Sequence, residues 1–161
     1  MVMSPYDEFA VETALKHKEA AGGEVTALTV GGNGAEKILK DAKAIGVDHI
    51  VRVDAEGEMD SNALQSVLAN AVAELGGEVV YCGKSAADTG AGSTGPGLAE
   101  RMGWTSVSNI IGASFDDGVS VVMPSGGGNA KVGVPLPAVI SCDKGDLKVR
   151  KPNVKGIMQA K

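Results

Sequence analysis

The sequence predicts an α/β fold of three layers, with a mostly parallel sheet covered by helices on both faces. Up to Cys82, short apolar strand segments alternate with longer segments whose apolar residues recur at helical spacing. After Gly103 the helical spacing disappears, and short strand-like segments follow one another. We therefore expect a parallel sheet first and short antiparallel strands after it.

The first helix has clear start and stop signals. Ser4 is a capping residue, Pro5 stands at the first helical position, and Asp7 is the acid of the first turn. Two glycines after Ala21 end the helix.

The same patterns define the later elements. We expect strands at 24–30, 48–53 and 78–82, helices at about 33–45, from Asp60 or Ser61 to Leu75, and over 97–102, and short strands at 106–113, 119–123, 131–134 and 137–142. The glycine-rich run 125–129 is interpreted as a hairpin connection rather than a ligand site. These elements make residues 1–142 one α/β domain, followed by a basic extended arm at 143–161.

Composition excludes several function classes. With 161 residues, a net charge of −5 and 3% aromatic residues, the chain is a poor match for nucleic-acid binding. Cys82 and Cys142 are interpreted as reduced core thiols, and the two histidines lack metal-ligand spacing. No segment has the apolar length of a membrane span, so we expect a cytoplasmic protein.

The segment 83–94 is the strongest candidate site, because it lies between a predicted strand and a predicted helix. Ligands collect at the carboxyl ends of parallel strands, and helix N-termini favour anions. Small residues let the main chain approach a ligand closely, and Lys84 adds a positive charge. A nucleotide phosphate matches both features. A ligand-free flexible loop is the alternative. Asp88 either accepts hydrogen bonds from loop amides or contacts the ligand.

No catalytic constellation is visible. Ser85 and Ser93 have no evident histidine partner, and no nucleophile, base and acid can be combined from the sequence. We therefore predict a binding protein without catalytic residues of its own.

Several stretches in order resemble one known family. They include PYDEFAVE from Pro5, GKSAAD from Gly83, TGPGLAERMGW from Thr94, PLPAVI from Pro135 and the closing GIMQAK from Gly156. Together they resemble the electron transfer flavoprotein β subunit over nearly the whole chain. That family has an adenine nucleotide α-hydrolase-like, or Rossmann-like, fold.

The resemblance implies a binding site and partners. It implies AMP or a second FAD on this chain, and a flavoprotein α subunit that holds most of a redox FAD and passes on electrons from an acyl-CoA-type dehydrogenase. The implied contacts are Ser4, Pro5, Tyr6, Asp7 and Val30 toward adenine, and Gly83, Lys84, Ser85, Ala86, Ala87, Asp88, Thr89, Gly90, Ala91, Gly92, Ser93 and Thr94 toward phosphate.

The sequence departs from the family before its first helix. Family members have a strand and about thirty further residues there, so relative to them this chain is truncated. We expect one of three outcomes: another chain or domain supplies that strand, the sheet closes differently, or the chain is a truncated relative that has lost the function. The alternative function is a stand-alone adenine-nucleotide-binding regulatory or scaffold module without electron transfer.

The arm at 143–161 is predicted to bind a partner. Ile157 and Met158 match the family ending and are expected to dock on the α subunit, and Leu147 is expected to meet a dehydrogenase. Basic residues, among them Lys148 and Arg150, would steer the arm toward an acidic surface.

Overall fold

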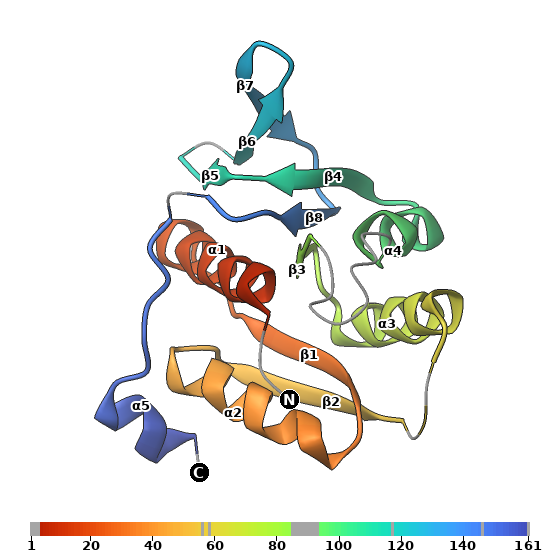
Figure 1. The fold of residues 1–161 in the computed structure, drawn as a ribbon, viewed down its shortest axis with the longest axis vertical. Coiled ribbons are helices and arrows are strands. Elements are labelled where there is room, and N and C mark those ends of the chain that lie inside the picture. The colour runs from red at the N-terminus through yellow and green to blue at the C-terminus, as the bar shows by residue number, and fades with distance from the viewer. Residues whose placement is uncertain are drawn as a thin grey trace.

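The computed structural model describes residues 4–55, 57, 59–84, 94–116, 118–145 and 147–160. Helices alternate with strands as far as β4, and strands then follow one another as far as β8 (Figure 1). The elements are α1 (Pro5–Ala21), β1 (Thr26–Gly31), η1 (Asn33–Ala35), α2 (Glu36–Ala44), β2 (His49–Asp54), α3 (Ser61–Leu75), β3 (Val79–Gly83), α4 (Thr94–Met102), β4 (Thr105–Ile110), β5 (Gly112–Ser114), β6 (Val119–Ser125), β7 (Gly128–Val134), β8 (Ala138–Cys142) and α5 (Val154–Gln159).

The strands form three small sheets. β1 pairs with β2 in parallel, β8 lies between β3 and β4 and is parallel to both, and β5, β6 and β7 are antiparallel. Side chains of α1 and α2 pack on one face of the parallel strands, and α3 and α4 pack on the other. The predicted three-layer α/β class is therefore confirmed. The parallel strands form two separate sheets, one with β1 and β2 and the other with β3, β8 and β4.

The helix boundaries follow from their caps. The Ser4 side chain accepts a hydrogen bond from the Asp7 amide at the start of α1, and Asp60 caps α3 in the same way. Gly76 ends α3 with φ of 69°, a left-handed conformation that glycine adopts without strain. The two start signals were predicted from sequence, whereas Gly76 was not singled out as the stop signal of α3.

Two expectations for the later strands were wrong. The segment 106–113 is not one strand, because β4 has an irregularity between Val107 and Ile110, where Asn109 has φ of 59° and its amide donates to the Ser141 hydroxyl. The chain then crosses to the antiparallel sheet as β5. β8 is not an antiparallel addition either, since it returns between β3 and β4 after the hairpin of β6 and β7. The hairpin at 125–129 is confirmed.

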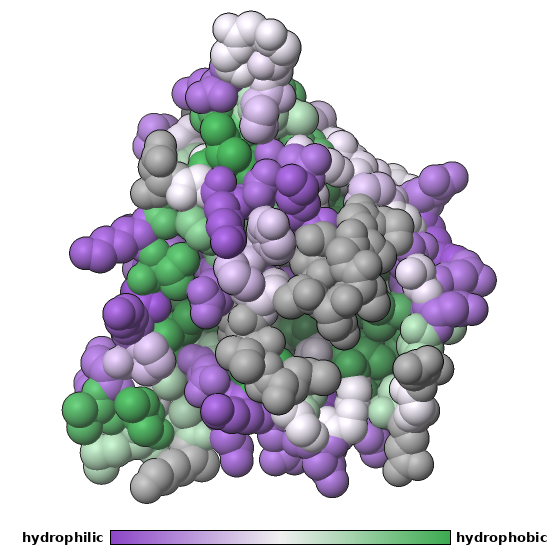
Figure 2. Space-filling view, viewed as in Figure 1, coloured by the Kyte–Doolittle hydropathy of each residue, from purple (hydrophilic) through white to green (hydrophobic). Residues whose placement is uncertain are grey.

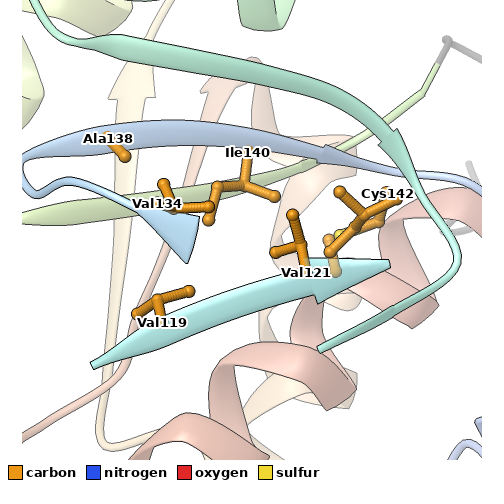
Figure 3. Close-up of a cluster of buried hydrophobic side chains, with 8 residues drawn as sticks. Val119, Val121, Val134, Ala138, Ile140 and Cys142 are labelled. Atoms are coloured by element: carbon orange, nitrogen blue, oxygen red, sulfur yellow. The ribbon is translucent and has the colours of Figure 1, made fainter. Parts of the chain in front are cut away.

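The largest buried cluster lies between α1, β8 and the antiparallel sheet (Figure 3). β8 is buried at all five positions because it has a strand on each side and packed side chains on both faces. Val121 of β6 and Ile140 of β8 are fully buried there. The core thus joins the two kinds of sheet and fixes β8 beside β3.

The C-terminal segment is bound to the domain at two places, which corrects the expectation of an extended arm. Arg150 makes hydrogen bonds to Glu12 of α1 at 2.9 Å from Nε and 3.0 Å from Nη2, and its amide makes a third. Residues 154–159 form α5, which packs on α2 (Figure 1). Gly156 allows this contact, because a Cβ there would collide with the Ala44 carbonyl oxygen.

Candidate functional site

The candidate site is built around the N-terminus of α1. The Ser4 hydroxyl accepts from the Asp7 amide at 3.1 Å and donates to Asp7 Oδ2 at 2.9 Å. Ser4 is buried, and Pro5 occupies the first helical position, where no amide donor is needed. The cap therefore fixes the orientation of the Asp7 carboxylate.

Asp7 connects this helix start to the end of β3. Its Oδ1 accepts a hydrogen bond from the Gly83 amide at 3.1 Å. A Cβ on Gly83 would lie 2.6 Å from Asp7 Oδ1 and 2.9 Å from the Cβ of Tyr6. Only glycine permits so close an approach, and the contact brings Ser4, Tyr6 and Asp7 beside the start of the predicted phosphate loop.

Lys84 continues this junction toward the end of β8. Its amide donates to the Cys142 carbonyl at 2.8 Å, and its ammonium group pairs with Asp143 Oδ2 at 3.1 Å. Lys144 Nζ lies 5.7 Å from the centroid of the Tyr6 ring, within cation–π range. Two lysines and two acids, Asp7 and Asp143, therefore flank the end of β3, and both lysine side chains remain accessible to solvent.

The N-terminus of α4 lies against the same strand ends. A Cβ on Gly95 would be 3.0 Å from Cys82 Sγ and 3.3 Å from Ser141 Cβ, so the first turn of α4 packs directly on β3 and β8. The helix begins at Thr94, three residues earlier than predicted, because Pro96 is tolerated in the first turn, where its missing amide costs little. A helix N-terminus in general favours an anion.

The structure brings together six of the predicted site residues. Ser4, Pro5, Tyr6, Asp7, Gly83 and Lys84 meet at the junction of α1 and β3, and Thr94 begins α4. Val30 is in β1, which belongs to a different sheet. The other predicted contacts lie outside the described residues: Ser85, Ala86, Ala87, Asp88, Thr89, Gly90, Ala91, Gly92 and Ser93.

Sequence reasoning missed Asp143 and Lys144 as members of the site. They directly follow β8, whose last residue, Cys142, pairs with Gly83 in the parallel register. Had β8 been predicted as the neighbour of β3, its carboxyl end would have pointed to them. The position of Asp143 and Lys144 directly after a predicted strand was the available signal, but using it required the strand order.

Buried titratable groups near the site are held in their neutral forms. Desolvation raises the pKa of Cys82 and of Cys142 to about 12, and the nearby negative charge of Asp7 further opposes ionisation of both thiols. Both are therefore protonated free thiols, as predicted, and poor nucleophiles at neutral pH. Among the described residues no group of three acids, histidines or cysteines could hold a metal.

A partly buried polar contact lies on the face of β3 toward α1. His17 Nδ1 is 2.9 Å from the Tyr81 hydroxyl, and the imidazole stacks on Phe115 at 4.4 Å between ring centroids. Desolvation lowers the pKa of His17 and raises that of Tyr81. The pair is thus a neutral, packed contact.

The layered fold and the polar junction at the strand ends define the class as a doubly wound α/β domain with a candidate anion site at its carboxyl edge. A sequence model of the electron transfer flavoprotein domain matches residues 1–161. The chain belongs to the electron transfer flavoprotein domain family, as its sequence predicted.

The relatives of this chain include β subunits. It is 32% identical to the electron transfer flavoprotein subunit beta of Bacillus subtilis (99% of this chain, 64% of the relative) and 31% identical to that of Syntrophomonas wolfei (100% and 65%). It is also 32% identical to the acryloyl-CoA reductase electron transfer subunit gamma of Anaerotignum propionicum (98% and 62%). The chain spans just under two thirds of the length of each of these relatives. None of the described helices combines the length and apolarity needed to cross a bilayer.

Proposed function

We propose that this chain acts as a β subunit, or β-like component, of an electron transfer flavoprotein and binds the AMP moiety of AMP or of FAD. The observation that carries the proposal is the junction of Ser4, Tyr6 and Asp7 with Gly83 and Lys84 at the end of β3. A nucleotide needs both a polar recess for its base and ribose and a cationic edge for its phosphate. This junction places polar groups of α1 beside the cationic groups of Lys84 and Lys144.

The charges at the junction support one orientation of the nucleotide over the other. A phosphate near Asp7 would meet a carboxylate, so the α1 side suits the ribose and adenine, whose hydroxyl and amino groups can donate to an acid. The phosphate belongs on the side of Lys84, Lys144 and the α4 N-terminus. Residues 85–93 and Val30 complete the site in this proposal.

In this proposal the chain's part in electron transfer is to bind and orient the nucleotide. A bound flavin supplies the redox chemistry, and the chain contributes protonated thiols and packed neutral groups that do not compete with it. The ion pair with Asp143 holds the Lys84 ammonium group at the end of β3 when no phosphate is bound. These roles need no catalytic residue on this chain.

The partner in this proposal is a flavin-carrying α subunit that docks on α5. Val154, Ile157 and Met158 are 76%, 51% and 69% exposed, and they form an apolar surface at the lower left of Figure 2. Their exposure in an already folded helix lowers the ordering cost of binding. Leu147, earlier in the same segment, is the proposed contact for an acyl-CoA-type dehydrogenase.

Calorimetry with AMP tests the nucleotide site. Lys84→Met removes a charged hydrogen-bond donor to phosphate, which is worth about 1.5 kcal/mol or more, and should weaken AMP binding at least about tenfold. Lys131→Met makes the same change of charge on the exposed β7 strand and should leave AMP affinity unchanged. Equal affinities for both variants would remove Lys84 from the site.

Pull-down with an electron transfer flavoprotein α subunit tests the partner surface. Replacing Ile157 and Met158 together by Asp should abolish the complex and leave AMP binding intact, because charges on an apolar docking surface are desolvated on binding. The matched control is Val132→Asp, which places the same charge at an exposed apolar position on β7, away from α5. An undiminished complex with the double variant would exclude α5 as the docking surface.

A further inference from the structure

An open groove lies at the amino ends of three neighbouring parallel strands, at the edge of the sheet opposite to the candidate nucleotide site. It is lined by residues that come directly before these strands: Gly77 and Glu78 before β3, Leu136 and Pro137 before β8, and Trp104 before β4. The volume of the groove is about 420 Å³. Ligand pockets have volumes of about 300–1,000 Å³, so the groove is large enough for a small organic molecule.

Backbone hydrogen bonds hold the walls of this groove in place. The Glu78 carbonyl accepts from the Ala138 amide at 3.1 Å, and the Pro137 carbonyl accepts from the Thr105 amide at 3.2 Å. Trp104 directly precedes Thr105 in the chain. The three segments that line the groove are therefore joined to one another by the sheet, and the groove is formed before a ligand binds.

The strand order sets the width of the groove. β8 lies between β3 and β4. Neighbouring strands are about 4.8 Å apart, so the backbones of Glu78 and Trp104 are separated by roughly 10 Å. Leu136 and Pro137 lie between them as an apolar floor, and Leu136 is 44% exposed. A residue with a carboxylate and a residue with an indole ring thus lie on opposite sides of an apolar floor.

Both of these side chains have surface left for a ligand. Trp104 packs on the buried cluster that contains Leu98 and Val139, and the part of it that stays accessible lines the groove. Glu78 is exposed, and within the described part of the chain its carboxylate takes part in no ion pair or hydrogen bond. The acid can therefore pair with a ligand without losing a contact inside the protein.

The electrostatic surroundings of the groove favour a positive charge. α3 and α4 each end two residues before a residue that lines it, and helix C-termini carry a partial negative charge. Glu74 and Glu100 are exposed acids in the last turns of these two helices. Arg101 is the only cation in the described residues of those turns, and it donates to the Asn62 side chain. An anion would be repelled by this edge of the sheet.

We propose that this groove binds a small organic ammonium ion, with its charge between the Glu78 carboxylate and the Trp104 ring and its alkyl groups on Leu136 and Pro137. Indole is the aromatic side chain that attracts a cation most strongly, and quaternary ammonium groups are typical ligands of such rings. The alkyl groups suit the apolar floor. A metal ion fits less well, because Ca²⁺ and Mg²⁺ need several oxygen ligands and the groove offers one carboxylate.

Titration of the chain with choline tests this inference. Trp104 is the only tryptophan in the sequence, so its fluorescence reports on the groove itself. At constant ionic strength, choline should change the emission along a saturating curve, and the amide resonances of Gly77 and Leu136 should shift with the same dissociation constant. Dimethylbutanol, the carbon isostere of choline without its charge, should bind at least about threefold more weakly, because it lacks both the ion pair and the cation–π contact.

Two variants isolate the contribution of the acid. Glu78→Gln keeps the size of the side chain, and it should weaken choline binding about threefold while leaving the response to dimethylbutanol unchanged. Glu36→Gln makes the same change of charge at an exposed position of α2 that does not line this groove, and it should change neither response. Glu78 bonds to β8 through its backbone carbonyl, so the variant should keep the parent's far-UV circular dichroism spectrum.

Three results would overturn the proposal. Equal affinities for choline and dimethylbutanol would mean that the groove is an apolar surface without preference for a cation. Equal choline affinities of Glu78→Gln and Glu36→Gln would remove Glu78 from the site. No saturable change in either the emission of Trp104 or the two amide resonances would show that the groove binds no ammonium ion.

Discussion

The ion pair between Glu12 and Arg150 gives the most quantitative prediction. Glu12 is 1% exposed, and its carboxylate accepts three hydrogen bonds, all from Arg150. Arg150→Met leaves only the bond from the backbone amide. The charge of Glu12 then stays buried without a compensating cation.

The magnitude follows from the burial of the acid. Removing one partner of a buried pair costs about 3–5 kcal/mol, and the lower end applies because the Arg150 side chain is 32% exposed. The second acid, Glu19, is half exposed at its side chain and adds little. Arg150→Met should therefore lower the free energy of unfolding by about 3 kcal/mol.

Urea unfolding measures this change. With a slope of about 2 kcal/mol/M, the midpoint should fall by about 1.5 M. Lys151→Met, an exposed neighbour, is the matched control and should stay within about 0.5 kcal/mol of the parent. Replacing both Glu12 and Arg150 by Met should recover much of the loss, because no buried charge remains. A midpoint for Arg150→Met equal to that of the control would refute this account of the C-terminal segment.

Two further predictions concern His17 and Gly156. Burial lowers the pKa of His17 in the folded state, so its contribution to stability is complete above the unfolded pKa of about 6.5 and is lost as pH falls through the folded pKa. Between pH 7.5 and pH 5.5, urea unfolding should show a larger loss of unfolding free energy for the parent than for His17→Phe. Equal losses in the two proteins would contradict this prediction. Gly156→Ala places a Cβ against the Ala44 carbonyl and should release α5 from α2, which faster proteolysis at 154–159 would reveal. Gly126→Ala, which has open space around its Cβ, is the control and should leave the cleavage rate unchanged. Equal cleavage rates in the two variants would exclude this contact.

The sequence predicted the elements that have strong local signals. Ser4 and Pro5 start α1, Gly22 ends it, and Asp60 starts α3, because caps act through residues a few positions apart. The junction of Asp7 and Gly83 was anticipated only through the family resemblance, since it joins residues 76 positions apart. Local patterns carry no information about such pairs.

Strand order and buried charge were the features that sequence reasoning missed. The segment 137–142 was predicted as a strand, but apolar spacing does not reveal that it runs parallel between β3 and β4. Asp143 and Lys144 were missed for that reason. Arg150 was interpreted as a residue that steers the arm toward a partner, whereas it binds Glu12 within the same chain.

The central claim is that an AMP moiety binds where α1 meets the end of β3. Its most direct test is an NMR titration of the chain with AMP, in which every backbone amide reports on its own surroundings. The account predicts that the resonances of Asp7, Gly83 and Lys84 shift together with one dissociation constant, while that of Lys131 on β7 does not move. Saturable shifts confined to other parts of the chain, or no shifts at all, would contradict it.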